Sequence, residues 1–191
     1  MSKLATKPAT AADWKDIETV FAGCGDASRC WCAWWRKPRA EFRAGYGAAN
    51  KRFFKNLVET SPHPLGVLAY RDGEPAGWCA VAPRADHSRF ERSNLLAPVD
   101  GVPVWSITCF VIHKAHRGAG LMRPLIAAAV KLTKRHRAPA VEGYPIDPIR
   151  GLGSGEVFTG LPGPFADQGF VEVARRSPIR PIMRLDLTRK T

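Results

Sequence analysis

The hydrophobic pattern is strongest in the middle of the chain. A run rich in β-branched and aromatic residues spans 104–112 and predicts a buried strand. Hydrophobic residues then recur at helical spacing over 121–132, which predicts a long helix that ends near His136. Pro124 places the start of this helix near Gly120, because proline is tolerated in the first turn, where its missing N–H is not needed. A strand, a short turn and a long helix therefore form the central unit.

The segments on either side of this unit predict a mixture of helices and strands. Before it we expect helices over 11–22 and 41–60 and a hairpin of strands over 65–70 and 76–81. After it we expect a strand over 140–144, a long loop over 146–163, a short helix near 165–170 and closing strands over 171–174 and 182–187. The 191 residues are expected to form one domain, 1–191, with a flexible tail over 1–10, although 4–8 carry a weak strand pattern.

The chain is strongly basic, with a formal net charge of +12. Such a charge attracts anions, for example phosphate groups, nucleic acid or acidic substrates, although it is equally compatible with a solvated basic surface. The lysines and arginines are scattered, which argues against a nucleic-acid partner. No apolar run is long enough to span a bilayer and no signal peptide is evident, so we expect a cytoplasmic protein without a membrane partner.

Five cysteines raise the question of disulfides or a metal. They are Cys24, Cys30, Cys32, Cys79 and Cys109. Without a secretion signal we expect no disulfides, and the last two fall in predicted strands as core thiols. The spacing of the first three lacks the paired knuckles of a zinc site, so we predict no metal.

The turn before the long helix has the properties of an anion site. The N–H groups of Gly118 to Arg123 have no partner within the helix, and the positive end of the helix dipole lies there. Arg117, Lys114 and Arg123 add positive charge. Glycine lets the backbone approach a bulky phosphate closely.

The run Arg117-Gly118-Ala119-Gly120 after a buried strand resembles the acyl-CoA site of the GNAT N-acetyltransferases. That family shows Arg or Gln, two residues, Gly, one residue, then Gly or Ala. Met122 stands where the last small residue is expected, so the fit is partial. Gln168-Gly169-Phe170 resembles the Gly-Phe that ends the last short helix of the family. The order of predicted elements agrees with this family over nearly the whole chain.

The resemblance implies an α/β (α+β) fold: one GNAT-like domain with a mixed central sheet, flanking helices and splayed strands around the cofactor. It implies acetyl-CoA as co-substrate, with its pantetheine arm between strands 104–112 and 140–144. One backbone N–H of the first strand would then polarise the thioester carbonyl. The implied cofactor-binding residues are Phe110, Val111, Ile112, Arg117, Gly118, Ala119, Gly120, Leu121 and Met122.

The acid and base of the implied reaction do not follow the family pattern. Phe165 occupies the position at which many members carry a tyrosine that acts on the leaving thiol. Tyr144 is a candidate substitute, and Glu142 shares its face of the strand and is a candidate base. The alternatives are structural: Tyr144 packs its ring with its hydroxyl in water, and Glu142 pairs with an arginine. His63, His87, His113 and His116 are expected at the surface.

Three tryptophans lie close together at Trp31, Trp34 and Trp35. They predict either a hydrophobic plug at one end of the core or, as the resemblance favours, the wall of an acceptor pocket.

The leading hypothesis is an N-acyltransferase that moves an acetyl group from acetyl-CoA directly to a small-molecule or peptide amine in a ternary complex. The alternative is an acyl-CoA- or anion-binding module with the same fold and little or no turnover. A homodimer is an open option for the assembly.

Overall fold

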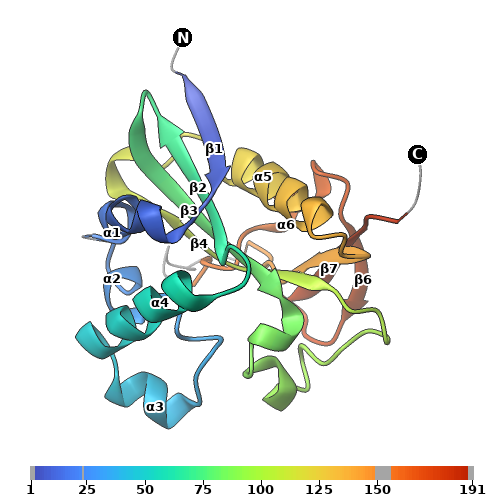
Figure 1. Ribbon diagram of the computed structural model, residues 1–191. Coiled ribbons are helices and arrows are strands. Elements are labelled where there is room, and N and C mark those ends of the chain that lie inside the picture. The colour runs from blue at the N-terminus through green and yellow to red at the C-terminus, as the bar shows by residue number, and fades with distance from the viewer. Residues whose placement is uncertain (1–2, 23, 149–155, 189–191) are drawn as a thin grey trace.

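The computed structural model describes residues 3–22, 24–148 and 156–188. Its centre is a seven-stranded sheet in the order β1-β2-β3-β4-β5-β7-β6 (Figure 1). The strands are β1 (Leu4–Pro8), β2 (Gly66–Arg71), β3 (Glu74–Pro83), β4 (Trp105–Ile112), β5 (Ala140–Gly143), β6 (Val171–Arg175) and β7 (Pro181–Asp186). The α-helices are α1 (Trp14–Phe21), α2 (Ala27–Cys30), α3 (Arg39–Ala44), α4 (Ala48–Thr60), α5 (Met122–Arg135) and α6 (Pro162–Ala166).

The sheet is mixed. The pair β4–β5 is parallel, whereas every other neighbouring pair is antiparallel. The parallel pair is joined by α5, as a crossover connection requires. The structure therefore confirms the predicted single α/β domain with a mixed sheet flanked by helices.

Helices cover both faces of the sheet (Figure 1). The apolar stripe of α5, which includes Leu125, Ile126 and Ala129, packs on one face. The opposite face is covered by α1 and α4, whose Phe21 and Phe54 enclose Trp78 of β3. A third, smaller cluster around Trp35, Phe90 and Tyr144 covers the ends of β5 and β7 on this same side. None of the described helices has both the length and the apolar character that a membrane crossing needs.

Three segments differ from the pattern-based expectation. Leu4–Pro8 is a strand paired with β2, inside the segment where a tail was expected. The predicted helix over 41–60 is two helices, since Gly47 adopts a left-handed φ of 101° between them. The four-residue α2 escaped prediction because so short a helix shows no periodicity.

A bulge in β4 separates the two parallel strands. Ala80 of β3 pairs with Cys109 and the next residue, Val81, pairs with Ile107, so Thr108 is an extra residue. Pairing between β4 and β5 is confined to Trp105–Ile107 and ends at Gly143. Beyond this point the outer edge of β4 has no β5 partner, and we call this divergence the fork.

Candidate active site

The turn that leads into α5 presents unpaired backbone donors. The N–H groups of Gly118 to Met122 form no hydrogen bond with the described part of the chain. Gly118 and Gly120 have left-handed φ angles of 73° and 71°, and a Cβ at either position would extend into open space. Any side chain there would be strained and would fill the space in front of the donors. The helix starts at Met122, two residues after the predicted position, so the full turn is left as a donor loop.

The outer edge of β4 carries the next donor. The N–H of Phe110 donates a hydrogen bond to the carbonyl of Phe158 at 2.7 Å, so it points away from β3. Successive residues of a strand alternate in direction, and the backbone groups of Val111 therefore face Trp78 of β3. This corrects the predicted cofactor set, because Val111 has no free backbone group on the fork side. Ile112, like Phe110, faces the fork side.

Phe165 of α6 closes the inner end of the fork. Its side chain has no solvent exposure and packs edge-on against Phe110, with ring centroids 6.0 Å apart. A Cβ at Gly143 would meet the Phe165 ring at 2.2 Å, and one at Gly160 would meet the rings of both phenylalanines at 2.9 Å. Phe165, for which a tyrosine was the expectation from the resemblance, is thus an apolar plug without a proton to donate.

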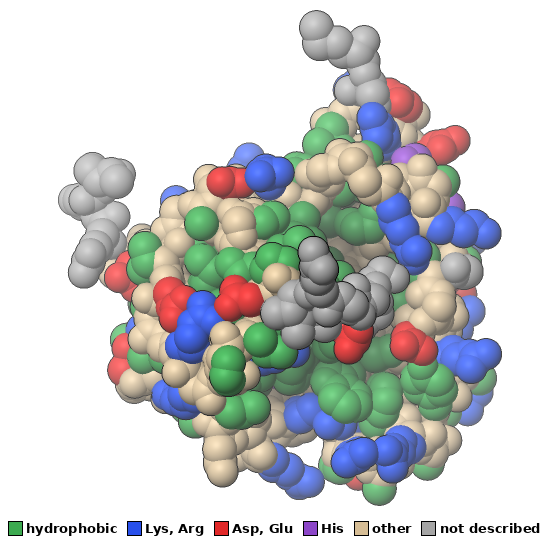
Figure 2. Space-filling view, turned by 180° about the vertical axis from the view of Figure 1, so that it is seen from behind, with side chains coloured by type: hydrophobic (Ala, Val, Ile, Leu, Met, Phe, Trp, Pro, Cys, Tyr) green, Lys and Arg blue, Asp and Glu red, His purple; other side chains and the backbone are tan. Residues whose placement is uncertain are grey.

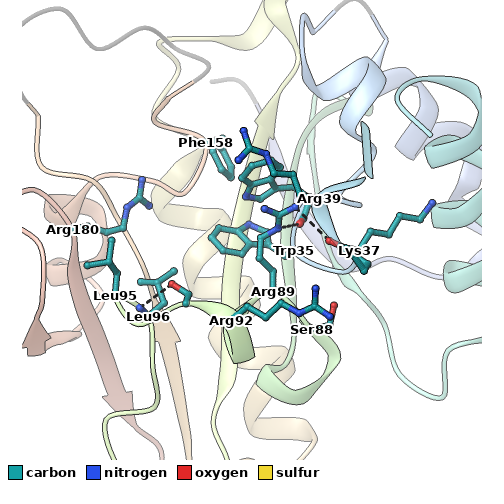
Figure 3. Close-up of a pocket in the computed structure, with 13 residues that line it drawn as sticks. Trp35, Lys37, Arg39, Ser88, Arg89, Arg92, Leu95, Leu96, Phe158 and Arg180 are labelled. Atoms are coloured by element: carbon teal, nitrogen blue, oxygen red, sulfur yellow. Dashed lines mark hydrogen bonds between the residues drawn. The ribbon is translucent and has the colours of Figure 1, made fainter. Parts of the chain in front are cut away.

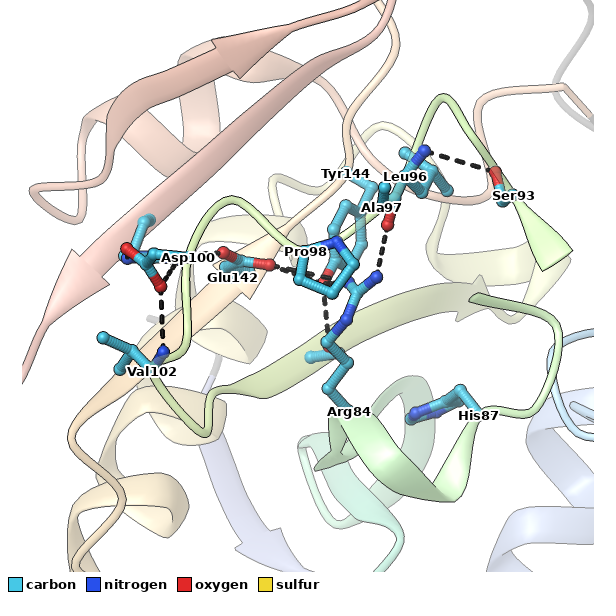
Figure 4. Close-up of polar contacts among 12 residues, drawn as sticks. Arg84, His87, Ser93, Leu96, Ala97, Pro98, Asp100, Val102, Glu142 and Tyr144 are labelled. Atoms are coloured by element: carbon cyan, nitrogen blue, oxygen red, sulfur yellow. Dashed lines mark hydrogen bonds and ion pairs between the residues drawn. The ribbon is translucent and has the colours of Figure 1, made fainter. Parts of the chain in front are cut away.

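Glu142 and Tyr144 lie together in a buried polar network (Figure 4). The Tyr144 hydroxyl donates to Glu142 Oε2 at 2.8 Å, accepts from Arg84 at 2.9 Å and is 2.8 Å from Ser106 Oγ. Glu142 Oε1 accepts from Arg184 at 2.7 Å. Burial and the adjacent carboxylate raise the pKa of Tyr144 far above its usual value.

The arginines that complete this network come from distant parts of the chain. Arg184 of β7 binds Glu142 and also Asp100, at 2.6 Å and 3.1 Å, and the salt bridge holds the pKa of Asp100 below its usual value. Arg84 follows β3 and also donates to the carbonyl of Leu96. The predicted pairing of Glu142 with an arginine is therefore present, whereas the Tyr144 hydroxyl is not in water. A catalytic role for the two residues stays a prediction.

A cavity of about 510 Å³ lies beside β4, where its lining residues Trp35 and Phe158 are hydrogen-bonded to that strand (Figure 3). Trp34, Trp35 and Phe158 form its aromatic walls. The rest of the lining is Lys37, Pro38, Arg39, Ser88, Arg89, Arg92, Ser93, Leu95, Leu96 and Arg180. Trp35 Nε1 donates to the carbonyl of Thr108 at 3.0 Å, so the wall is attached directly to the bulge of β4. A second cavity, of about 440 Å³, lies between the segments 83–91 and 98–105.

Trp31 does not contribute to the first cavity. It stacks on Phe21 with ring centroids 5.0 Å apart and is 5% exposed, within the core under α1 and α4. Its left-handed backbone, with φ of 48°, turns the chain so that Trp31 and Trp34 face opposite ways. Of the three tryptophans, two therefore line a cavity and one is a core plug.

Pattern reasoning missed several site residues. His87 was expected at the surface but is 2% exposed, because Nδ1 contacts the carbonyl of Pro83 and the ring packs on Phe90. Burial and the charge of Arg36 lower its pKa well below the usual value. Ser106 could have been found, since it lies opposite Glu142 in the parallel register. No motif or hydrophobic pattern in the sequence around Arg84, Arg180 or Phe158 indicates that these residues belong to the site.

The remaining chemistry-bearing side chains form no second centre. All five cysteines are free thiols. Within the described residues, no group of three or more His, Cys, Asp or Glu side chains could hold a metal ion. Basic side chains lie in separate groups around a central apolar region on the face shown in Figure 2.

Comparison with known proteins gives consistent results. Residues 28–143 match the model of the acetyltransferase (GNAT) family. Among solved structures, arylalkylamine N-acetyltransferase 2 from Aedes aegypti aligns with a TM-score of 0.59 and 12% identity, over 97% of this chain and 100% of that one. The Drosophila melanogaster polyamine N-acetyltransferase aligns with a TM-score of 0.56 and 12% identity, over 97% and 100%.

A third solved structure, yncA from Salmonella typhimurium with its cofactor acetyl-CoA, aligns with a TM-score of 0.54 and 13% identity, over 98% and 95%. At these identities the alignments show a shared fold. No curated protein matches the sequence.

Proposed function

The chain belongs to the GNAT acetyltransferase family, and from this we propose that it transfers an acetyl group from acetyl-CoA to the amine of an acceptor. The observation that carries the proposal is the fork between β4 and β5, placed next to a turn of unpaired N–H groups. The structure with acetyl-CoA bound, yncA, supports the choice of co-substrate. The acceptor class is a small-molecule or peptide amine.

The turn before α5 fits a diphosphate. Five consecutive N–H groups, Gly118 to Met122, have no partner in the described structure, and the two left-handed glycines keep the space before them open. The dipole of the 14-residue α5 adds positive potential at the same place. We propose Arg117 to Met122 as the residues that hold the phosphates.

The fork, unlike the turn, is not fully open to its proposed ligand, the pantetheine arm of acetyl-CoA. Ile112 and Phe110 present their backbone on the open side of β4, yet the Phe110 N–H is bonded to Phe158. Binding of an arm along β4 therefore requires the Phe158 carbonyl to give up this donor. Once released, the Phe110 N–H is placed to stabilise negative charge on a carbonyl oxygen in the fork.

When bound, acetyl-CoA supplies a thioester whose carbonyl carbon accepts the amine nitrogen, with loss of the thiol. The chain must orient the two reactants, polarise the carbonyl and remove the amine proton. Trp34 and Trp35 would orient the acceptor in the cavity. We propose Glu142 and Tyr144 for proton transfer, since the Tyr144 hydroxyl donates a hydrogen bond to Glu142 Oε2 at 2.8 Å near the fork.

A specific observation also favours a second candidate function, an acyl-CoA-binding module with little turnover. Phe165 has no proton to donate, and neither Glu142 nor Tyr144 is more than 1% exposed. Such a protein would hold acetyl-CoA in the fork without passing the acetyl group on.

The release of CoA thiol over a panel of amines separates the two functions. We expect at least one amine to release thiol above the rate of hydrolysis, with an acetylated product detectable by mass. Calorimetric binding of acetyl-CoA with no thiol release for any amine would establish the binding module. An intact fold with no acetyl-CoA binding at millimolar concentration would reject both.

A further inference from the structure

The cavity beside the fork is lined by positive charge without a counter-charge. Five of its lining residues are basic and none is acidic. One of the five, Lys37, directs its ammonium group away, toward the Phe53 ring at 4.3 Å and Asn50 (Figure 3). The other four, Arg39, Arg89, Arg92 and Arg180, we call the cavity arginines.

None of the cavity arginines forms an ion pair with a described residue. Arg89 lies over the Trp34 ring, 3.7 Å from its centroid, and within the described residues its side chain donates only to the carbonyls of Trp34 and Lys37. Among the residues that the structure describes, the Arg180 side chain donates only to Thr159 Oγ1 and the carbonyl of Tyr144, at 3.3 and 3.4 Å. Each guanidinium group has five donors, so most of this donor capacity is unused.

The charged state of two of the cavity arginines is disfavoured. Burial and then the charge of Arg39 lower the pKa of Arg89. Burial alone lowers the pKa of Arg180. Partly buried like charges are unfavourable unless an anion joins them.

Five arginines elsewhere in the described structure form ion pairs, whereas others, such as Arg135 and Arg176, are exposed and form none there. Arg175 binds Asp147 and Glu172, and Arg184 binds Asp100 and Glu142. Arg123, beside the predicted phosphate turn, pairs with Asp167 at 2.5 Å. The cavity arginines differ from the exposed unpaired ones in that they line one cavity together, with no acidic residue among its lining.

The cavity lies where an acceptor would meet the acetyl group. Trp35 is hydrogen-bonded to the carbonyl of Thr108, and the Phe158 carbonyl accepts a hydrogen bond from Phe110. Two walls of the cavity therefore contact the open edge of β4. We infer that the acceptor is an amine that also carries an anionic group, a carboxylate or a phosphate, held by the cavity arginines with its apolar body against Trp34 and Trp35. This inference rests on the proposed function. A polyamine would add positive charge to the cavity and is disfavoured.

Matched amine pairs test the inference through thiol release with acetyl-CoA. Phenylalanine against phenethylamine tests a carboxylate, O-phosphoethanolamine against ethanolamine tests a phosphate, and spermidine tests a polycation. We expect the anionic member of at least one pair to have a kcat/KM about tenfold higher or more, the value of one charge-assisted contact. The inference would be overturned if phenethylamine, ethanolamine or spermidine had a kcat/KM equal to or higher than that of both anionic amines.

Variants assign the effect to the cavity. Arg180→Gln and the exposed Arg92→Gln should each raise the KM of the preferred anionic amine about tenfold and leave the calorimetric affinity for acetyl-CoA within about twofold. Arg135→Gln, at the far end of α5, removes the same charge and should change neither. Loss of acetyl-CoA affinity in the cavity variants would overturn the inference, because the arginines would then serve the cofactor phosphates.

A binding readout keeps the inference separate from turnover. If no amine releases thiol, the transfer function fails, but the charge preference of the cavity can still be measured by NMR. The reporter is the indole N–H resonance of Trp35, which is assigned by comparison with Trp35→Phe. A shift with phenylalanine or O-phosphoethanolamine, but not with phenethylamine or ethanolamine, supports an anion-selective cavity. No shift with either anionic probe at millimolar concentration overturns it.

Discussion

Tyr144 has no side-chain surface in contact with solvent, and its hydroxyl is shared among Glu142, Arg84 and Ser106. A buried hydroxyl with three partners stabilises the fold only while all of them are present, because each would otherwise be left without a hydrogen bond in a low-dielectric interior. The residue therefore supports the end of β5 whether or not it also transfers a proton.

Tyr144→Phe is expected to lower the free energy of unfolding by about 1–3 kcal/mol, since it removes the buried hydroxyl to which Arg84, Ser106 and Glu142 are hydrogen-bonded. Urea denaturation measures this. Tyr46→Phe is the matched control, because its phenol donates to Asp26 at the surface and should change stability by about 0.5 kcal/mol or less. Equal effects of the two variants would contradict the buried network. The kcat of Tyr144→Phe, measured on the folded fraction, tests the proposed proton transfer.

His87 makes the stability depend on pH. Its folded pKa lies well below 6.5, owing to burial and to Arg36 and Arg84. Below pH 6.5 the unfolded chain therefore binds a proton that the folded chain does not, so the free energy of unfolding falls as pH falls. The slope from this residue approaches about 1.4 kcal/mol per pH unit.

The measurement is urea denaturation between pH 5 and 6.5 in roughly half-unit steps, a window set by the ordinary histidine pKa. His87→Gln should flatten the slope, whereas His113→Gln, in the turn after β4, should leave it unchanged. An identical slope in His87→Gln and the parent protein would show that His87 is not buried in its neutral form.

At the scale of elements, the bulge of β4 and the plug of α6 shape the fork. Thr108 ends the pairing with β5, and Phe165 fills the space that this leaves next to Gly143. The segment with Phe158 then takes the first free donor of β4. Binding of a ligand in the fork must therefore move this segment.

Selective ¹⁵N-phenylalanine labelling tests this movement. Addition of acetyl-CoA should shift the amide resonances of Phe110 and Phe158, because the bond between them is exchanged for one to the ligand. Phe54, in the middle of α4, should not shift. Unchanged Phe110 and Phe158 resonances at saturating acetyl-CoA would show that the arm does not bind along β4.

The sequence predicts the parts of this fold that depend on local pattern. The run 104–112, Pro124 and the glycines of the turn are enough to place β4, the donor turn and α5 next to one another. The same periodicity cannot show which faces meet. The pairing of Glu142 with Arg184, the burial of His87 and the turn of Trp31 into the core depend on contacts between distant segments.

At the scale of the whole molecule, a protein of net charge +12, positive potential is concentrated at two places that differ in kind. In the turn before α5 the positive potential comes from backbone N–H groups and the α5 dipole, whereas in the cavity beside the fork it comes from arginine side chains. The wider surface carries separate basic groups (Figure 2). Such a field steers anionic ligands toward the protein, and the two sites then determine which of them bind.

Calorimetric titration of acetyl-CoA into the parent protein, Gly120→Asp and Gly73→Asp tests the central claim most directly. Both glycines have a left-handed φ, 71° and 88°, with open space where a Cβ would lie, so the two variants carry the same strain and charge. We expect the parent and Gly73→Asp to bind alike and Gly120→Asp to lose binding, since its carboxylate would face the diphosphate. Equal affinity in all three proteins, or no binding by the folded parent at millimolar acetyl-CoA, would contradict the claim that the turn before α5 holds the cofactor.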